Sequence, residues 1–67
     1  MTMQTIIDNL TQAQALEWYE TTDKYCWVDD NILEPAGLFA TDRRVELIEN
    51  ALDDILTAVI VDALATK

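Results

Sequence analysis

Carboxylates are the side chains of this 67-residue chain that could support chemistry. Glu17 and Glu20 are three residues apart, as are Glu46 and Glu49, and Asp53 follows four residues after Glu49. On an α-helix these spacings place carboxylates on neighbouring turns of one face. Oxygen ligands gathered in this way can bind Mg²⁺. A solvated acidic face, which any soluble amphipathic helix carries, explains the same pattern more simply.

The segment RRVELIENALDDIL resembles the metal-binding helix of all-α nucleoside triphosphate pyrophosphohydrolases of the MazG type. That family holds Mg²⁺ with a Glu-x-x-Glu motif on one helix and a Glu-x-x-Asp motif on another. The pair on the earlier helix fits the first motif. Glu46 and Glu49 approximate the second, because Asp53 lies one residue too far from Glu49. The resemblance implies an Mg²⁺-dependent hydrolase assembled from the helices of a dimer, and this is the alternative hypothesis.

Other catalytic arrangements lack the residue types they need. The chain has no Ser and no His, which excludes the usual Ser-His-Asp and Cys-His sets. The lone Cys26 is expected to be a small buried hydrophobe. The acidic cluster at Asp29, Asp30, Asn31 and Glu34 lacks the central Gly of a calcium loop, and reads as a solvated turn. We therefore expect a protein that is not an enzyme and has no metal or cofactor.

The charge balance narrows the kind of partner. Thirteen acids against four bases give a net charge of −9, which opposes direct binding to nucleic acid. A protein with a basic or apolar surface is the expected partner. Trp27 lies beside the acidic turn, and it is a docking residue if exposed or a plug of the core if buried. The predicted partner-binding residues are Trp27, Asp29, Asp30, Glu34, Asp42, Glu46, Glu49 and Asp53.

The second half of the chain carries the clearest structural signal. Thr41 is a good helix N-cap, and apolar residues then recur at spacings of 3, 4, 3 and 4. These residues, which form an a/d-type seam, are Val45, Ile48, Leu52, Ile55 and Val59. The pattern predicts a helix over roughly 41–65.

The first half predicts a helix over roughly 4–25, or two helices with a break near 10–11. The break is favoured by Thr11 and Gln14, which can form a capping box. A short turn is expected near 30–33, before the break at Pro35 and Gly37. The inward face of the helix is predicted to hold Ala15, Leu16, Trp18 and Tyr19. The expected fold is one all-α domain over 1–67, a small helical hairpin or bundle.

The end of the later helix is apolar around nearly its whole circumference. One partner helix cannot cover such a surface, and a chain this short has a marginal core. We therefore predict that a homodimer completes the fold, with an interface made by Ile55, Val59, Ile60 and Leu64. The chain has no apolar run of about 20 residues and no basic leader region, so a cytoplasmic protein is expected.

Three functions follow from these observations. The first is a non-enzymatic inhibitor or modulator of the phage or mobile-element type, which could mimic nucleic acid by placing carboxylates where a partner expects phosphates. The Mg²⁺-dependent pyrophosphohydrolase is the second. The third is a structural subunit of a larger assembly.

Overall fold

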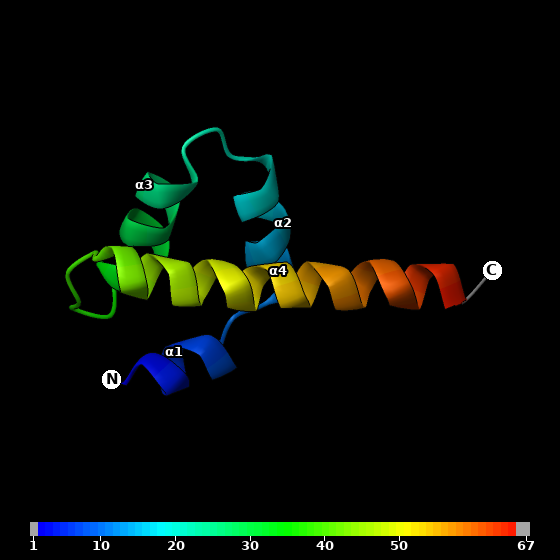
Figure 1. The fold of residues 1–67 in the computed structure, drawn as a ribbon, viewed down its shortest axis with the longest axis horizontal. Coiled ribbons are helices and arrows are strands. Elements are labelled where there is room, and N and C mark those ends of the chain that lie inside the picture. The colour runs from blue at the N-terminus through cyan, green and yellow to red at the C-terminus, as the bar shows by residue number, and fades with distance from the viewer. Residues whose placement is uncertain (1, 66–67) are drawn as a thin grey trace.

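Residues 2–65, the part described by the computed structural model, form four α-helices and one π-helical segment, without strands (Figure 1). In chain order the elements are α1 (Met3–Asp8), α2 (Gln12–Glu20), α3 (Lys24–Val28), η1 (Asp29–Leu33) and α4 (Asp42–Ala65). The all-α class is confirmed. The long helix predicted over 41–65 is confirmed as α4.

The long helix α4 is the element on which the others pack. In Figure 1, α1 lies on one side of α4, and α2 and α3 lie on the other. The most extensive packing joins α2 to α4. The short helices lie beside the first part of α4, and its C-terminal end extends past them. The first half of the fold is therefore a set of short helices around a rod, rather than one long helix paired with another.

The break near 10–11 is confirmed, and the capping box is its cause. The Thr11 hydroxyl accepts a hydrogen bond from the backbone N–H of Gln14 at 3.2 Å. The Gln14 side chain accepts one from the backbone N–H of Thr11 at 2.9 Å. Because both donors are satisfied at the start of a new helix, α1 does not continue into α2.

A second break, between α2 and α3, makes the single helix predicted over 4–25 wrong. The Asp23 carboxylate accepts a hydrogen bond from the backbone N–H of Cys26 at 3.1 Å, which starts a new helix. The Lys24 ammonium group donates to the carbonyl oxygen of Thr21 at 3.0 Å and so caps the end of α2. At the end of α2 and at the start of α3, side-chain caps therefore take the place of the main-chain hydrogen bonds that one continuous helix would have formed.

The turn expected near 30–33 is the π-helical segment η1. The backbone N–H of Glu34 donates to the carbonyl of Asp29 at 2.8 Å, the i→i+5 pairing that defines this geometry. The chain then reverses at Gly37, whose φ of 75° is readily adopted by glycine. The hydroxyl of Thr41 accepts from the backbone N–H of Arg44 at 3.2 Å, so the predicted N-cap of α4 is confirmed.

The core lies between α4 and the short helices. Its buried residues are Ile6, Ala15, Trp18, Trp27, Val28, Ile32, Leu33, Val45, Ile48, Leu52 and Leu56. On α4 the buried spacing is 3, 4 and 4, so Leu56 replaces the predicted Ile55 at the core. In a straight α-helix, which has 3.6 residues per turn, the face that points to the core shifts gradually around the helix, and Leu56 then lies on it. The 3.5-residue repeat of a coiled coil would have kept Ile55 on that face.

Candidate protein-binding site

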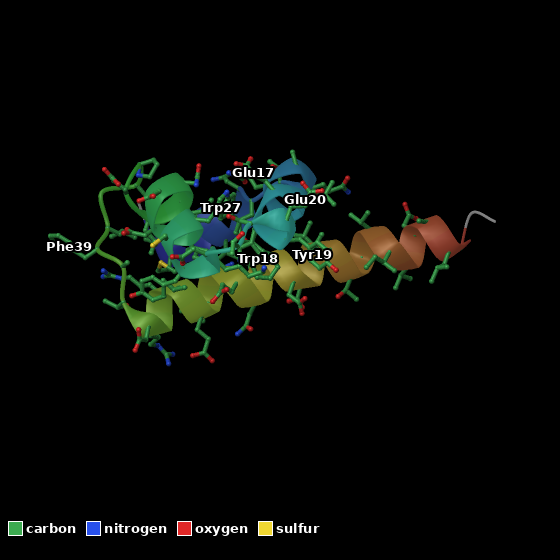
Figure 2. All side chains as sticks on the ribbon, turned by 90° about the horizontal axis from the view of Figure 1, so that it is seen from above. Glu17, Trp18, Tyr19, Glu20, Trp27 and Phe39 are labelled. Atoms are coloured by element: carbon green, nitrogen blue, oxygen red, sulfur yellow. The ribbon has the colours of Figure 1, made fainter. Side chains whose placement is uncertain are left out.

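The two tryptophans belong to the core, not to the surface. Trp27 is only 8% exposed, and its indole nitrogen donates to the Glu17 carboxylate at 3.2 Å. Trp18 is buried to the same degree and donates to the Glu49 carboxylate at 3.3 Å. Figure 2 shows both rings turned inward between α2, α3 and α4. Of the two alternatives predicted for Trp27, the structure shows the buried one: its ring fills part of the core. Trp27 therefore does not offer a docking surface in this structure.

Phe39 is the large apolar side chain that the fold leaves most open, with 86% of its surface exposed. Its ring points away from the molecule at the end opposite to the C-terminal end of α4 (Figure 2). The loop that carries it is fixed by hydrogen bonds. The Arg44 guanidinium donates to the Phe39 carbonyl at 3.0 Å, and the backbone N–H of Leu38 donates to the Leu33 carbonyl at 3.0 Å. The exposed ring therefore stands on an ordered support.

An open hollow lies beside this ring, and we call it the Phe39 site. It is lined by Asp29, Glu34, Gly37, Leu38, Phe39 and Ala40. Two of the acids predicted to bind a partner, Asp29 and Glu34, are thus brought to the exposed ring. The predicted Asp30 is exposed on η1, and the predicted Asp42 is exposed in the first turn of α4. The site combines an apolar wall with the carboxylates of Asp29 and Glu34.

The acids predicted along α4 have different surroundings. Glu46 is exposed, Glu49 accepts the indole hydrogen bond described above, and Asp53 lines a separate groove beside α2. Within residues 2–65, no three acidic or cysteine side chains gather closely enough to hold a metal ion. Glu17 and Glu20 are therefore not gathered with the acids of α4 into such a cluster within residues 2–65.

The separate groove, which we call the α2–α4 groove, is mostly apolar. Its lining residues are Leu16, Tyr19, Asp53, Leu56, Thr57, Val59 and Ile60. Leu16 and Tyr19, predicted as core, are exposed because the buried face of α2 is held by Ala15 and Trp18 instead. Of the predicted oligomer interface, Ile55 and Val59 are partly buried, whereas Ile60 and Leu64 are exposed.

Cys26 is exposed, contrary to the buried position predicted for it. Asp23 accepts the backbone hydrogen bond of Cys26, and this lowers the pKa of the Asp23 carboxyl. A side-chain hydrogen bond with Asp23, together with its negative charge, raises the pKa of the Cys26 thiol. The thiol is therefore mostly protonated near neutral pH, which makes it a weak nucleophile.

No protein-family model, curated protein or solved structure matches this chain. Among the helices of residues 2–65, none has both the length and the apolar character needed to cross a membrane. Phe39 is not among the partner-binding residues predicted from the sequence. The available signal was its position between Gly37 and Thr41, in a turn that leads directly into a capped helix.

Proposed function

We propose that this chain is a small non-enzymatic protein-binding module that inhibits or modulates a protein with an apolar pocket rimmed by basic side chains. The observation that carries the proposal is the exposure of Phe39 on an ordered loop, beside the carboxylates of Asp29 and Glu34. Aromatic rings are enriched in protein interfaces, where they supply a large contact area with few rotatable bonds.

The support under Phe39 favours binding. The hydrogen bonds from Arg44 and Leu38 fix the main chain on both sides of the ring before any partner arrives. Binding then has to order little more than one side chain, and the entropy cost of association is smaller than for a mobile loop. An aromatic anchor of this kind typically contributes more than about 1 kcal/mol to an interface.

The charge around the ring indicates the chemistry of the partner. Asp29 and Glu34 line the hollow beside Phe39, while Asp30 is exposed on η1 and Asp42 is exposed at the start of α4. Arg43 and Arg44 follow Asp42, and the Arg44 guanidinium binds the Phe39 carbonyl, but the four carboxylates outnumber these two cations on a chain with a net charge of −9. Lys and Arg around the partner's pocket would complement these carboxylates and would accelerate encounter. Added salt should weaken the complex, since it screens charges at a solvent-exposed rim. Carboxylates that stand in for phosphates would make the module a nucleic-acid mimic.

Self-association is the second part of the proposal. Ile55, Val59, Ile60 and Leu64 lie on the part of α4 that the short helices leave partly or fully uncovered. Exposed apolar surface of this kind marks interaction sites in soluble proteins. A second copy would complete the burial that one chain achieves only in part.

Photo-crosslinking from position 39 tests the partner-binding part. The variant Phe39→p-benzoylphenylalanine is expressed in the source cells and irradiated, with Tyr25→p-benzoylphenylalanine as the matched control at another exposed aromatic position. The protein captured only from position 39 is then purified, and its affinity is measured by calorimetry. Phe39→Ser should weaken binding about tenfold or more. No capture from position 39, or an unchanged affinity for Phe39→Ser, contradicts the proposal.

Two further measurements test separately whether the carboxylates attract the partner and whether the module mimics nucleic acid. The double variant Asp29→Asn and Glu34→Gln should weaken binding at low salt, and its affinity should approach that of the native chain at high salt. Heparin, a polyanion, should displace the module from a partner whose basic pocket normally holds nucleic acid. A complex that resists heparin would rule out mimicry while leaving protein binding intact.

A further inference from the structure

We infer that the α2–α4 groove receives the C-terminal half of α4 from a second copy of the chain, in an antiparallel twofold dimer that crosses near Ile60. This inference rests on the self-association part of the proposed function. It adds the geometry of the dimer and assigns Leu16 and Tyr19 of α2 to the interface, although both were expected in the core.

The groove and the helix that would fill it are parts of one surface. Leu16 and Tyr19 form the α2 wall of the groove, and Leu56, Val59 and Ile60 form its α4 wall. Directly beyond it on α4, Val61 and Leu64 are exposed (58% and 64%). A twofold interface uses the same patch on both copies, so the groove of each copy can take the apolar ridge of the other.

The charge on this surface favours a second copy over a basic partner. From residue 55 to residue 65 the sequence carries a single charged side chain, Asp62. Among the residues that line the groove, only Asp53 is charged. Lys or Arg side chains of a basic partner would find little to pair with here, in contrast to the Phe39 site. The apolar end of α4 itself matches this nearly neutral groove.

A dimer of modest size would use only a small part of the surface of this chain. An interface at the low end of the range for stable complexes buries about 600 Å² on each copy, roughly one eighth of the 4703 Å² surface of this chain. The large side chains exposed on this face are Leu16, Tyr19, Ile60, Val61 and Leu64. Figure 1 shows the end of α4 extending beyond α2, where a second helix can approach without displacing any element. In an antiparallel pair the two helix dipoles also oppose each other favourably.

Sedimentation equilibrium of the purified chain tests the inference. The native chain should have the mass of a dimer at about 100 µM, and Tyr19→Ser and Ile60→Ser should each raise the dissociation constant about tenfold. Phe39→Ser is the matched control, because it removes an even more exposed apolar ring at the opposite end and should leave the mass unchanged. Circular dichroism of each variant verifies that it has kept its helices.

The dependence on salt concentration distinguishes this dimer from a contact driven by charge attraction. Two copies with a net charge of −9 repel each other, and screening should therefore tighten the dimer between about 0.02 M and about 0.5 M NaCl. Binding at the Phe39 site should respond to salt in the opposite direction. A chain that stays monomeric at about 100 µM and high salt overturns the inference, as does a dimer weakened by salt.

Disulfide trapping tests the antiparallel direction. In a Cys26→Ala background, chains carrying Thr57→Cys are mixed with chains carrying Leu64→Cys and oxidised. An antiparallel crossing near Ile60 brings position 57 of one copy to position 64 of the other, so the mixed disulfide should predominate. Predominance of like-with-like disulfides, or a dimer unaffected by Tyr19→Ser and Ile60→Ser, overturns the geometry. All these assays use the pure chain, so their failure would leave partner binding at Phe39 untouched.

Discussion

Trp18 of α2 donates a hydrogen bond from its indole nitrogen to the Glu49 carboxylate of α4, over 3.3 Å and across 31 positions of sequence. The contact joins the two helices that pack most extensively. It gives Glu49 a structural role, where the acid pattern alone suggested a ligand or a partner contact. It also provides the indole N–H with an acceptor at the edge of the core, where an unpaired donor would destabilise the fold.

Replacing Glu49 should show the value of this contact. Glu49→Ala should lower the free energy of unfolding by about 1 kcal/mol, because it leaves the Trp18 N–H without its acceptor. Glu49→Gln keeps an acceptor oxygen for the Trp18 N–H and should lower the free energy of unfolding by less than Glu49→Ala does. Urea unfolding followed by tryptophan fluorescence measures both. Glu46→Ala, at an exposed position of the same helix, should change the free energy of unfolding by at most about 0.5 kcal/mol. Equal losses for Glu46→Ala and Glu49→Ala would refute the structural role.

Leu52 is fully buried at the centre of the face that α4 turns to the core. Leu52→Ala should cost about 2–5 kcal/mol, the sum of the lost burial and the cavity left behind. For a domain of this size that is a large part of the total stability. Thermal unfolding at fixed chain concentration provides the measurement. Phe39→Ser, which removes more apolar surface from an exposed position, should change stability far less.

Gly37 isolates a purely conformational effect. Its φ is +75°, and a Cβ at this position would meet no atom within 4 Å. Gly37→Ala should therefore destabilise the chain by about 1–2 kcal/mol through backbone strain alone. Gly37→Asn should be milder, since Asn tolerates the left-handed region better. If Ala and Asn cost the same in chemical unfolding, the strain explanation is wrong.

The thiol of Cys26 should react slowly for an exposed cysteine. Hydrogen bonding and negative charge from Asp23 raise its pKa above the ordinary value of 9.0, so little thiolate is present near neutral pH. Alkylation by iodoacetamide should be slower than for a short peptide with one cysteine. Asp23→Asn removes the charge and should increase the rate. A native rate equal to that of the peptide would contradict this assignment.

Asp23 should also make stability depend on pH. Its folded pKa lies below the ordinary 3.8, because the carboxylate form accepts the backbone hydrogen bond at the start of α3. The contribution is therefore present above about pH 4 and is lost as the pH falls through the lowered folded pKa. The stability difference between the native chain and Asp23→Asn should shrink over that interval. A difference that stays constant down to about pH 2 would exclude the linkage.

Elements fixed by local signals were predictable. The start of α4 and the break before α2 depend on Thr41 and on the Thr11–Gln14 box, whose partners lie three residues away. The break between α2 and α3 was not predicted, although Asp23 is a good N-cap, because the helical spacing of apolar residues continues through it. A helix end is hard to predict where a side chain competes with the main chain for a backbone hydrogen bond, as between α2 and α3. A helix start is easier to predict where a capping residue precedes a regular pattern of apolar residues, as at α4.

The candidate site was less predictable, since it depends on distant contacts. Trp18 and Trp27 find their carboxylates 31 and 10 positions away, and no local pattern indicates such pairs. Their burial leaves Phe39, Tyr19 and Tyr25 as the exposed rings, of which Phe39 is the most exposed. Asp29 and Glu34 were expected in a solvated turn, whereas the structure places them at the two ends of η1, with Asp29 half-buried. The sequence did not show that this segment lies beside Phe39.

The Phe39 site and the free end of α4 lie at opposite ends of a molecule whose long axis is 42 Å. A dimer joined through the α4 ends would therefore carry its two Phe39 rings on outward-facing ends. Such an assembly is bivalent, and on a target that is itself dimeric or repetitive the second contact would form at a high effective concentration. Modest affinity at each ring could then give long-lived occupancy, and Ile60→Ser would weaken that avidity without altering the Phe39 contact.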